Sequence, residues 1–189
     1  MSELSIASSA SFVAANYKSL TSAHTTTPIL FHIIHIANIS KSRLNQKDDW
    51  LEYNDPNNVS ADRLNKSNKI VREIKMGDDS TPVASVYDVY KLLLRDSHNN
   101  YCYGYEVEPL GFLRNSSSQS TGTPLPIRLG GRLIVKSGCL IQQGVLLLRN
   151  RQCNYLGIDE SETELVSQLN NGIVNKYIDV LDMELKEGS

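Results

Sequence analysis

The stretch "GGRLIVKSGCLIQQGVLLLRNRQCNYLG", residues 130–157, decides the fold of this chain. Glycines separate its short apolar runs, a pattern that predicts an apolar hairpin followed by a third short extended run. Four cations edge these runs: Arg132, Lys136, Arg149 and Arg151. The stretch contains no acid and no histidine. It therefore predicts a β framework with a basic rim, and it offers no acid–base pair for catalysis.

Three more segments have strand patterns. The run "ILFHIIHIANI", residues 29–39, is rich in β-branched and aromatic residues and predicts a largely buried strand. Residues 86–96 alternate in character, and the turn residues "SHNN" separate them from residues 101–110, which predicts an antiparallel hairpin. The fold class is therefore mainly β with flanking helices. An OB-fold, a five-stranded barrel, fits the strand count and the length, and an open α+β sandwich is the alternative.

Apolar residues at helical spacing predict a helix over residues 5–20 and another over 173–186. With 189 residues, the chain has room for one domain with a substantial core. We expect an N-terminal helix within residues 1–24, the barrel over 28–172, and a C-terminal helix and tail over 173–189.

A long insertion, residues 45–85, follows the first predicted strand. It is rich in Asn, Asp, Lys and Ser, and segments of this length between strands are more often functional or disordered than structural. It holds three apolar residues close together: Trp50, Leu51 and Tyr53. Such residues on a loop are typical anchors for a partner's pocket, although they could equally fold back on the barrel.

Basic residues recur at intervals of three within the insertion, and Lys66, Lys69 and Arg72 are among them. On an α-helix each step of three falls about 60° short of a turn, so these charges spiral around the axis. The pattern favours a solvated segment that touches DNA phosphates loosely.

Three tyrosines share one face of the strand that follows: Tyr101, Tyr103 and Tyr105. Aromatic rings on a strand can stack the bases of single-stranded nucleic acid, and they can equally serve packing alone. They are candidate DNA-binding residues.

The composition narrows the functional class further. A formal net charge of −2 gives no global basic field, and three cysteines without a C-x-x-C pair predict a reducing compartment. Since His32 and His35 lie three apart on a strand, they cannot share a metal ion. No nucleophile motif, phosphate loop, secretory leader or membrane-spanning run is recognisable. We expect no catalytic residue, metal or cofactor, and no membrane association.

The stretch "LPIRLGGRLIVKSGCLIQQGVLLLRNRQCNYLG" resembles the OB-fold of the RecQ-mediated genome instability protein 1 family. The segments "LFHIIHIANISKSRLNQ" and "VYKLLLRDSHNNYCYGYEVEPL" resemble the family's first three strands. The resemblance covers residues 28–170. In two respects the chain departs from the family: Ile158 replaces the second glycine of an L-G-G element, and the N-terminal helical region is shorter.

The resemblance implies a non-catalytic DNA-repair and recombination subunit in the nucleus. Such a subunit binds and stabilises topoisomerase III, a type IA enzyme, and works with a RecQ helicase in decatenation and in dissolving double Holliday junctions. It implies that the insertion, residues 45–85, reaches toward the topoisomerase's DNA gate and regulates it. It also places Arg132 on the surface that faces the topoisomerase.

An alternative reading of the same barrel is a free-standing OB module that binds single-stranded DNA or RNA. The two functions differ in their dependence on salt. Binding driven by phosphate contacts falls steeply as salt rises, whereas docking through apolar anchors survives it.

Overall fold

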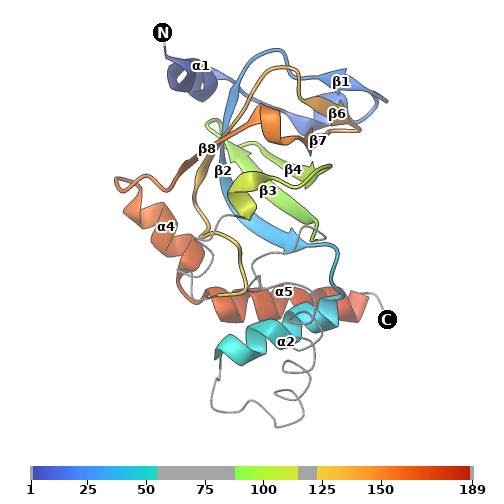
Figure 1. The fold of residues 1–189 in the computed structure, drawn as a ribbon, viewed down its shortest axis with the longest axis vertical. Helices are drawn as coiled ribbons and strands as arrows, with labels where there is room; N and C mark the ends of the chain where they lie inside the picture. The colour runs from blue at the N-terminus through green and yellow to red at the C-terminus, as the bar shows by residue number, and fades with distance from the viewer. Residues whose placement is uncertain (1, 55–87, 115–122, 188–189) are drawn as a thin grey trace, which may run out of the picture.

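The computed structural model describes residues 2–54, 88–114 and 123–187. Within them, eight strands form one sheet in the order β1-β6-β7-β4-β3-β2-β5-β8. The strands are β1 (Ala23–His24), β2 (Ile29–Asn38), β3 (Tyr90–Asp96), β4 (Tyr101–Glu106), β5 (Arg132–Val135), β6 (Leu140–Gln142), β7 (Val145–Leu148) and β8 (Cys153–Gly157). The sheet curls into a half-barrel (Figure 1). The fold is therefore mainly β with flanking helices, as the sequence predicts.

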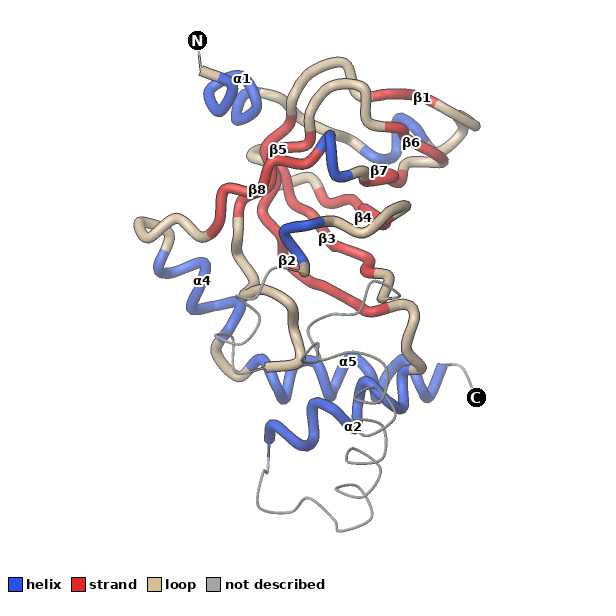
Figure 2. The backbone as a smooth tube through the Cα atoms, in the orientation of Figure 1, coloured by secondary structure: helices blue, strands red, loops and turns tan. Residues whose placement is uncertain are grey.

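Helices surround this sheet (Figure 2). The α-helices are α1 (Glu3–Ser9), α2 (Arg43–Asn54), α4 (Thr163–Asn170) and α5 (Ile173–Glu187), and the short 3₁₀ helices are η1 (Ala14–Tyr17), η3 (Gly111–Leu113) and η5 (Asn150–Gln152). The helices α2 and α5 lie side by side beyond one end of the sheet, and α1 lies at the opposite end. Helix α5 occupies the place predicted for residues 173–186.

Strands β3 and β4 form the predicted antiparallel hairpin. Their burial alternates along the chain, so that one set of side chains enters the core and the other faces outward. Gly104 lies on the inward side of β4. A Cβ atom there would lie 2.8 Å from Leu148 Cδ1. The missing side chain lets β7 pair with β4 in parallel, which continues the curl of the sheet.

The stretch 130–157 forms four short strands instead of the predicted hairpin and one further run. Strand β5 pairs with β2 and β8, whereas β6 pairs with β7. The tight turn of the β6–β7 hairpin contains Gln143 and Gly144, which have φ angles of 51° and 84°. Two positive φ angles in succession are the geometry of a type I′ hairpin turn, whose twist matches that of the strands. The five predicted strands thereby become eight.

The N-terminal segment does not form the single helix predicted for residues 5–20. Helix α1 ends at Ser9, extended residues follow, and η1 comes after them. Phe12 explains the break: its side chain is 2% exposed, and its ring stacks on that of Tyr17 at a centroid distance of 5.0 Å. The Phe12 N–H donates to Asp96 Oδ2 at 2.7 Å. Packing and this hydrogen bond override the local helical pattern.

The start of the predicted insertion, residues 45–85, is also ordered differently from the prediction. Residues 45–54 belong to helix α2, which packs along α5. Residues 55–85 lie outside the described residues. The boundary between barrel and insertion therefore falls later in the chain than the composition indicates.

Candidate partner and nucleic-acid interfaces

Tyr177 of α5 holds the helical pair against strand β2. Its ring lies between those of His35 and Trp50, each at a centroid distance of 4.4 Å and within 16° of parallel. Its hydroxyl accepts a hydrogen bond from the Ile36 N–H and donates one to the Ile36 carbonyl oxygen, both at 2.9 Å. Burial raises the pKa of Tyr177 above its ordinary value, so the phenol stays protonated and able to donate.

This stack corrects the prediction that Trp50 is an anchor for a partner. Trp50 is 3% exposed and belongs to the main core. Of the two alternatives left open by the sequence, the tryptophan folds back, and it does so onto α5. Leu51 points outward with 39% of its surface exposed and remains a candidate contact. Tyr53 lies in α2, but its side chain is outside the description.

The predicted phosphate contacts of the insertion, Lys66, Lys69 and Arg72, lie outside the described residues. Their proposed role stays a prediction.

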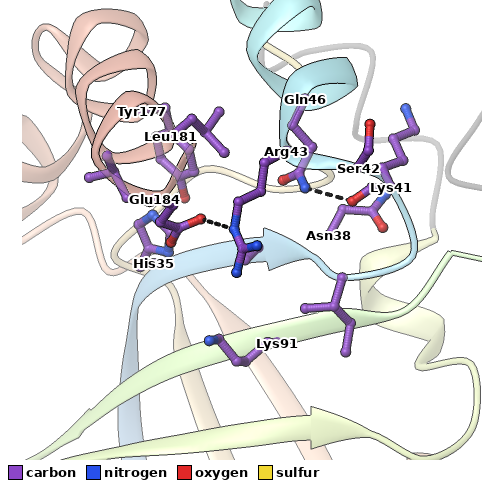
Figure 3. Close-up of a pocket in the computed structure, with 13 residues that line it drawn as sticks. His35, Asn38, Lys41, Ser42, Arg43, Gln46, Lys91, Tyr177, Leu181 and Glu184 are labelled. Atoms are coloured by element: carbon purple, nitrogen blue, oxygen red, sulfur yellow. Dashed lines mark hydrogen bonds and ion pairs between the residues drawn. The ribbon is translucent and has the colours of Figure 1, made fainter. Parts of the chain in front are cut away.

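A pocket of about 210 Å³ opens where β2, α2 and α5 meet (Figure 3). Its polar lining residues are His35, Asn38, Lys41, Ser42, Arg43, Gln46, Lys91 and Glu184. Arg43 Nε donates to Glu184 Oε2 at 2.8 Å, and Lys41 Nζ lies 3.3 Å from Asp49 Oδ2. Three cations thus line one small cavity, and Lys91 enters it from β3 (Figure 3). The sequence did not reveal this pocket, because its walls come from segments far apart in the chain.

Burial lowers the pKa of His35, at the edge of the pocket, below its ordinary value. Lys91 acts in the same direction, and Glu184 opposes both. The His35 imidazole is therefore neutral at physiological pH.

The three predicted tyrosines lie on the outward face of β4. Tyr101 is 52% exposed and Tyr103 is 44% exposed, whereas Tyr105 is half-buried. On the neighbouring strand, Arg95 is opposite Tyr101 and Lys91 is opposite Tyr105. The Lys91 Nζ lies 4.6 Å from the centroid of the Tyr103 ring, a cation–π contact. The sequence analysis missed Lys91 and Arg95 as functional candidates, although they occupy alternate positions of β3.

The acids of β3 and β4 lie on the inward face instead. Asp96 and Glu106 are 1% and 7% exposed. Glu106 pairs with Arg114, whose Nη2 donates to Glu106 Oε2 at 2.8 Å. Burial tends to raise the pKa of Asp96, but hydrogen bonds from Phe12, Asn100 and His98 lower it below its ordinary value. Both acids are thus occupied within the core.

Arg132, the predicted topoisomerase contact, begins strand β5. Its Nη1 lies 3.5 Å from Asp159 Oδ2, and its side chain is 21% exposed. In the ladder it is opposite His32, whose Nε2 lies 2.7 Å from Glu162 Oε2. Two ion pairs therefore lie together where β2 and β5 approach the chain before α4. His32 belongs to this cluster and His35 to the pocket.

The cysteine side chains are free thiols. Burial raises the pKa of Cys139 to about 11 and that of Cys153 to about 12, and it raises the pKa of Cys102 as well. They are protonated at neutral pH and hence weak nucleophiles. Among residues 2–54, 88–114 and 123–187, no cluster of three or more His, Cys, Asp and Glu side chains has the arrangement of a metal site. None of the described helices has the length and apolar character needed to span a membrane.

Comparison with known proteins identifies the family. A family model described as "RMI1, N-terminal OB-fold domain" matches residues 10–168. The chain is similar to RecQ-mediated genome instability protein 1 of Saccharomyces cerevisiae (strain ATCC 204508 / S288c), with 24% identity over 153 residues. That match covers 68% of this chain and 58% of the yeast protein, so the chain spans less than two thirds of its relative. The matched region contains the curled sheet, the tyrosines and Arg132, and on this ground the chain belongs to the family of the RMI1 N-terminal OB-fold domain.

Proposed function

We propose that this chain is a non-catalytic subunit that binds topoisomerase III and works with a RecQ helicase to preserve genome stability. In this role it stabilises the topoisomerase and regulates its DNA gate during decatenation and the dissolution of double Holliday junctions. The observation that carries the proposal is the family match over residues 10–168, together with the printed name of the yeast relative.

The surface around Arg132 supports docking of a protein partner. Arg132 and Asp159 are each partly exposed, and the neighbouring pair of His32 and Glu162 extends the charged area. Charges arranged in this way set the register and the association rate of an interface more than they set its affinity. The partner surface would have to offer charges that complement this pattern.

The cysteines support a non-catalytic role, because buried thiols with raised pKa values are poor nucleophiles. In the proposed complex, the topoisomerase supplies the tyrosine nucleophile and the metal for strand cleavage. A role on chromosomal DNA would also require nuclear localisation, which a fluorescent fusion of the full chain would test.

The direct experiment is size-exclusion chromatography of the full chain with topoisomerase III from the same organism. Co-elution without DNA is the expected result, because docking would use protein contacts. Separate elution at micromolar concentrations, with both proteins folded, would contradict the proposal. Co-elution only when DNA is present would mean that DNA bridges two independent binders.

The second experiment measures function. Added to topoisomerase III and its RecQ helicase, the chain should increase the yield of decatenated circles and of dissolved double Holliday junctions. Alone it should neither cleave nor relax supercoiled DNA. An unchanged yield at saturating concentrations of the chain would contradict a regulatory role.

A further inference from the structure

The outward face of β3 and β4 is aromatic and basic, and we call its five residues Tyr101, Tyr103, Tyr105, Lys91 and Arg95 the tyrosine face. The alternation of both strands directs these side chains away from the core. Two rings are close to half exposed, which is unusual for large aromatic side chains without a packing partner. Successive tyrosines on a strand lie about 6.6 Å apart, so they form a row of ring platforms.

The cations of this face are not neutralised within the described part of the chain. Neither Lys91 nor Arg95 forms an ion pair there, and the contact of Lys91 is with the ring of Tyr103. The acids of the same strands, Asp96 and Glu106, face the core. The face therefore has a local positive potential on a chain whose net charge is −2.

The pocket beside α2 and α5 continues this face. Lys91 belongs to both, since it contacts Tyr103 and also lines the pocket. Lys41 and Arg43 stand on the far wall, and Figure 3 shows the Arg43 guanidinium directed toward the strands. A row of rings thus leads to a cavity lined by cations.

We propose that the tyrosine face and the adjoining pocket form a single track that binds single-stranded nucleic acid. Bases stack on Tyr101 and Tyr103, while Arg95 and Lys91 contact the phosphates between them. The strand then continues so that a further phosphate lies at the pocket, near Arg43. Rings for the bases and cations for the backbone are the combination by which proteins bind single strands without reading their sequence.

The chemistry disfavours two other ligands for this face. Duplex DNA keeps its bases stacked and paired, so it cannot use exposed rings as platforms. A protein partner would require apolar anchors or acids on its side, and it would bind without the strong dependence on salt that phosphates impose. Each of these ligands predicts a different outcome in the following test.

The test is fluorescence anisotropy with the full chain, without topoisomerase, and labelled 20-nucleotide oligo(dT), oligo(U) and a duplex of equal length as probes. We expect the chain to bind a single-stranded probe at least about 10-fold more tightly than the duplex. Tyr101→Ala and Tyr103→Ala should each weaken single-strand binding about 10-fold. The matched controls Tyr101→Phe and Tyr103→Phe keep the ring and should bind like the wild type.

Salt titration tests the cations. Lys91→Gln and Arg95→Gln should each reduce the slope of log K against log salt by about 0.7, the value for one phosphate contact on a single strand. Lys176→Gln, which removes an exposed charge near α4 instead, should leave the slope unchanged. Comparison of oligo(dT) with oligo(U) decides between DNA and RNA as the source of the strand.

Several results would overturn the proposal: wild-type chain that binds neither single-stranded probe, equal binding of duplex, alanine variants that bind like the wild type, or phenylalanine variants as weak as the alanine ones. Loss of topoisomerase binding by the alanine variants, with oligonucleotide binding intact, would assign the face to a protein partner. Because these assays contain no topoisomerase, their failure is independent of the function proposed above.

Discussion

At the scale of single residues, Asp96 joins the N-terminal segment to the β3–β4 hairpin. Its carboxylate accepts hydrogen bonds from Phe12 N at 2.7 Å, His98 N at 2.9 Å, Asn100 N at 2.8 Å and Asn100 Nδ2 at 3.1 Å. A charged acceptor makes stronger hydrogen bonds than a neutral one. One buried anion therefore fixes both the hairpin turn and the path of the segment that contains Phe12.

Asp96→Asn should lower the free energy of unfolding by about 1.5–3 kcal/mol at pH 7, because it removes the charge and turns one acceptor into a donor. The folded-state pKa of Asp96 is lowered, so its contribution is present above the unfolded value of about 3.9 and is lost as pH falls below it. Urea titrations at pH 7 and below pH 4 should show the gap between variant and wild type narrowing. Asp179→Asn, on the exposed side of α5, is the control for loss of one charge.

His35 makes stability depend on pH in the opposite region of the scale. Its folded-state pKa is lowered, so unfolding takes up a proton as pH falls below the unfolded value of about 6.5. The wild type should therefore lose stability between pH 7.5 and 5.5. His35→Phe retains a ring for the stack on Tyr177 but cannot titrate, and its stability should decline less over this range. Parallel thermal-denaturation profiles for the two proteins would contradict the assignment.

Arg132 can be tested by exchanging the charges of its ion pair. Arg132→Glu should weaken co-elution with topoisomerase III and leave the fold intact, since the pair with Asp159 is partly exposed. The double variant Arg132→Glu, Asp159→Arg restores an internal ion pair with reversed polarity. If the partner reads the Arg132 charge, the double variant stays defective. Recovery of binding would mean that the ion pair only shapes the surface.

At the scale of elements, α2 and α5 form one unit that covers the end of the sheet (Figure 1). Ion pairs link them: Lys47 Nζ lies 2.5 Å from Asp182 Oδ1, and Arg43 pairs with Glu184. Such surface pairs contribute at most about 1 kcal/mol each. Burial of Trp50 against Tyr177 therefore dominates the attachment of α2.

Trp50→Ala should lower the free energy of unfolding by about 3–5 kcal/mol, because it removes a buried ring and leaves a cavity. Leu51→Ala, on the exposed side of the same helix, should change stability by less than about 0.5 kcal/mol. Guanidinium titrations of the two variants measure the contrast. A fully stable Trp50→Ala variant that no longer binds topoisomerase III would restore the anchor role rejected here.

Local pattern predicted the elements whose stabilising contacts are close in sequence. The alternation of residues 101–105 placed Tyr101 and Tyr103 on one face, and the outward face of β4 matches it. The same reasoning failed for α2, because a helix with few apolar residues resembles a solvated loop until Tyr177, far along the chain, supplies its partner. The pocket could not be predicted at all, since Lys41 and Lys91 meet only after the sheet has folded.

At the scale of the whole molecule, the charges are segregated in a way that the net charge of −2 conceals. Uncompensated cations occupy the tyrosine face, whereas the Arg132 cluster lies beyond strand β2, near the chain before α4. The two surfaces are thus separate, and one chain could hold a protein partner and a nucleic-acid strand together. This arrangement would suit a subunit that acts on DNA beside an enzyme.

Separate surfaces predict separable defects. A variant with both Tyr101→Ala and Tyr103→Ala should co-elute normally with topoisomerase III while losing single-strand binding. Arg132→Glu should show the reverse pattern. Measurement of both activities on both variants checks this expectation, and the coupled loss of both activities in either folded variant would mean that the surfaces act as one.

The paired hydrogen bonds of Tyr177 with Ile36 have a consequence for the dynamics of the chain. Strand β2 loses its β5 neighbour before Ile36, and a single phenol there replaces a strand as hydrogen-bonding partner. Exchange of the Ile36 amide hydrogen with solvent should therefore report detachment of α5, a local opening that requires less free energy than global unfolding. While α5 is detached, the bared edge of β2 is a template to which a strand of another molecule can pair.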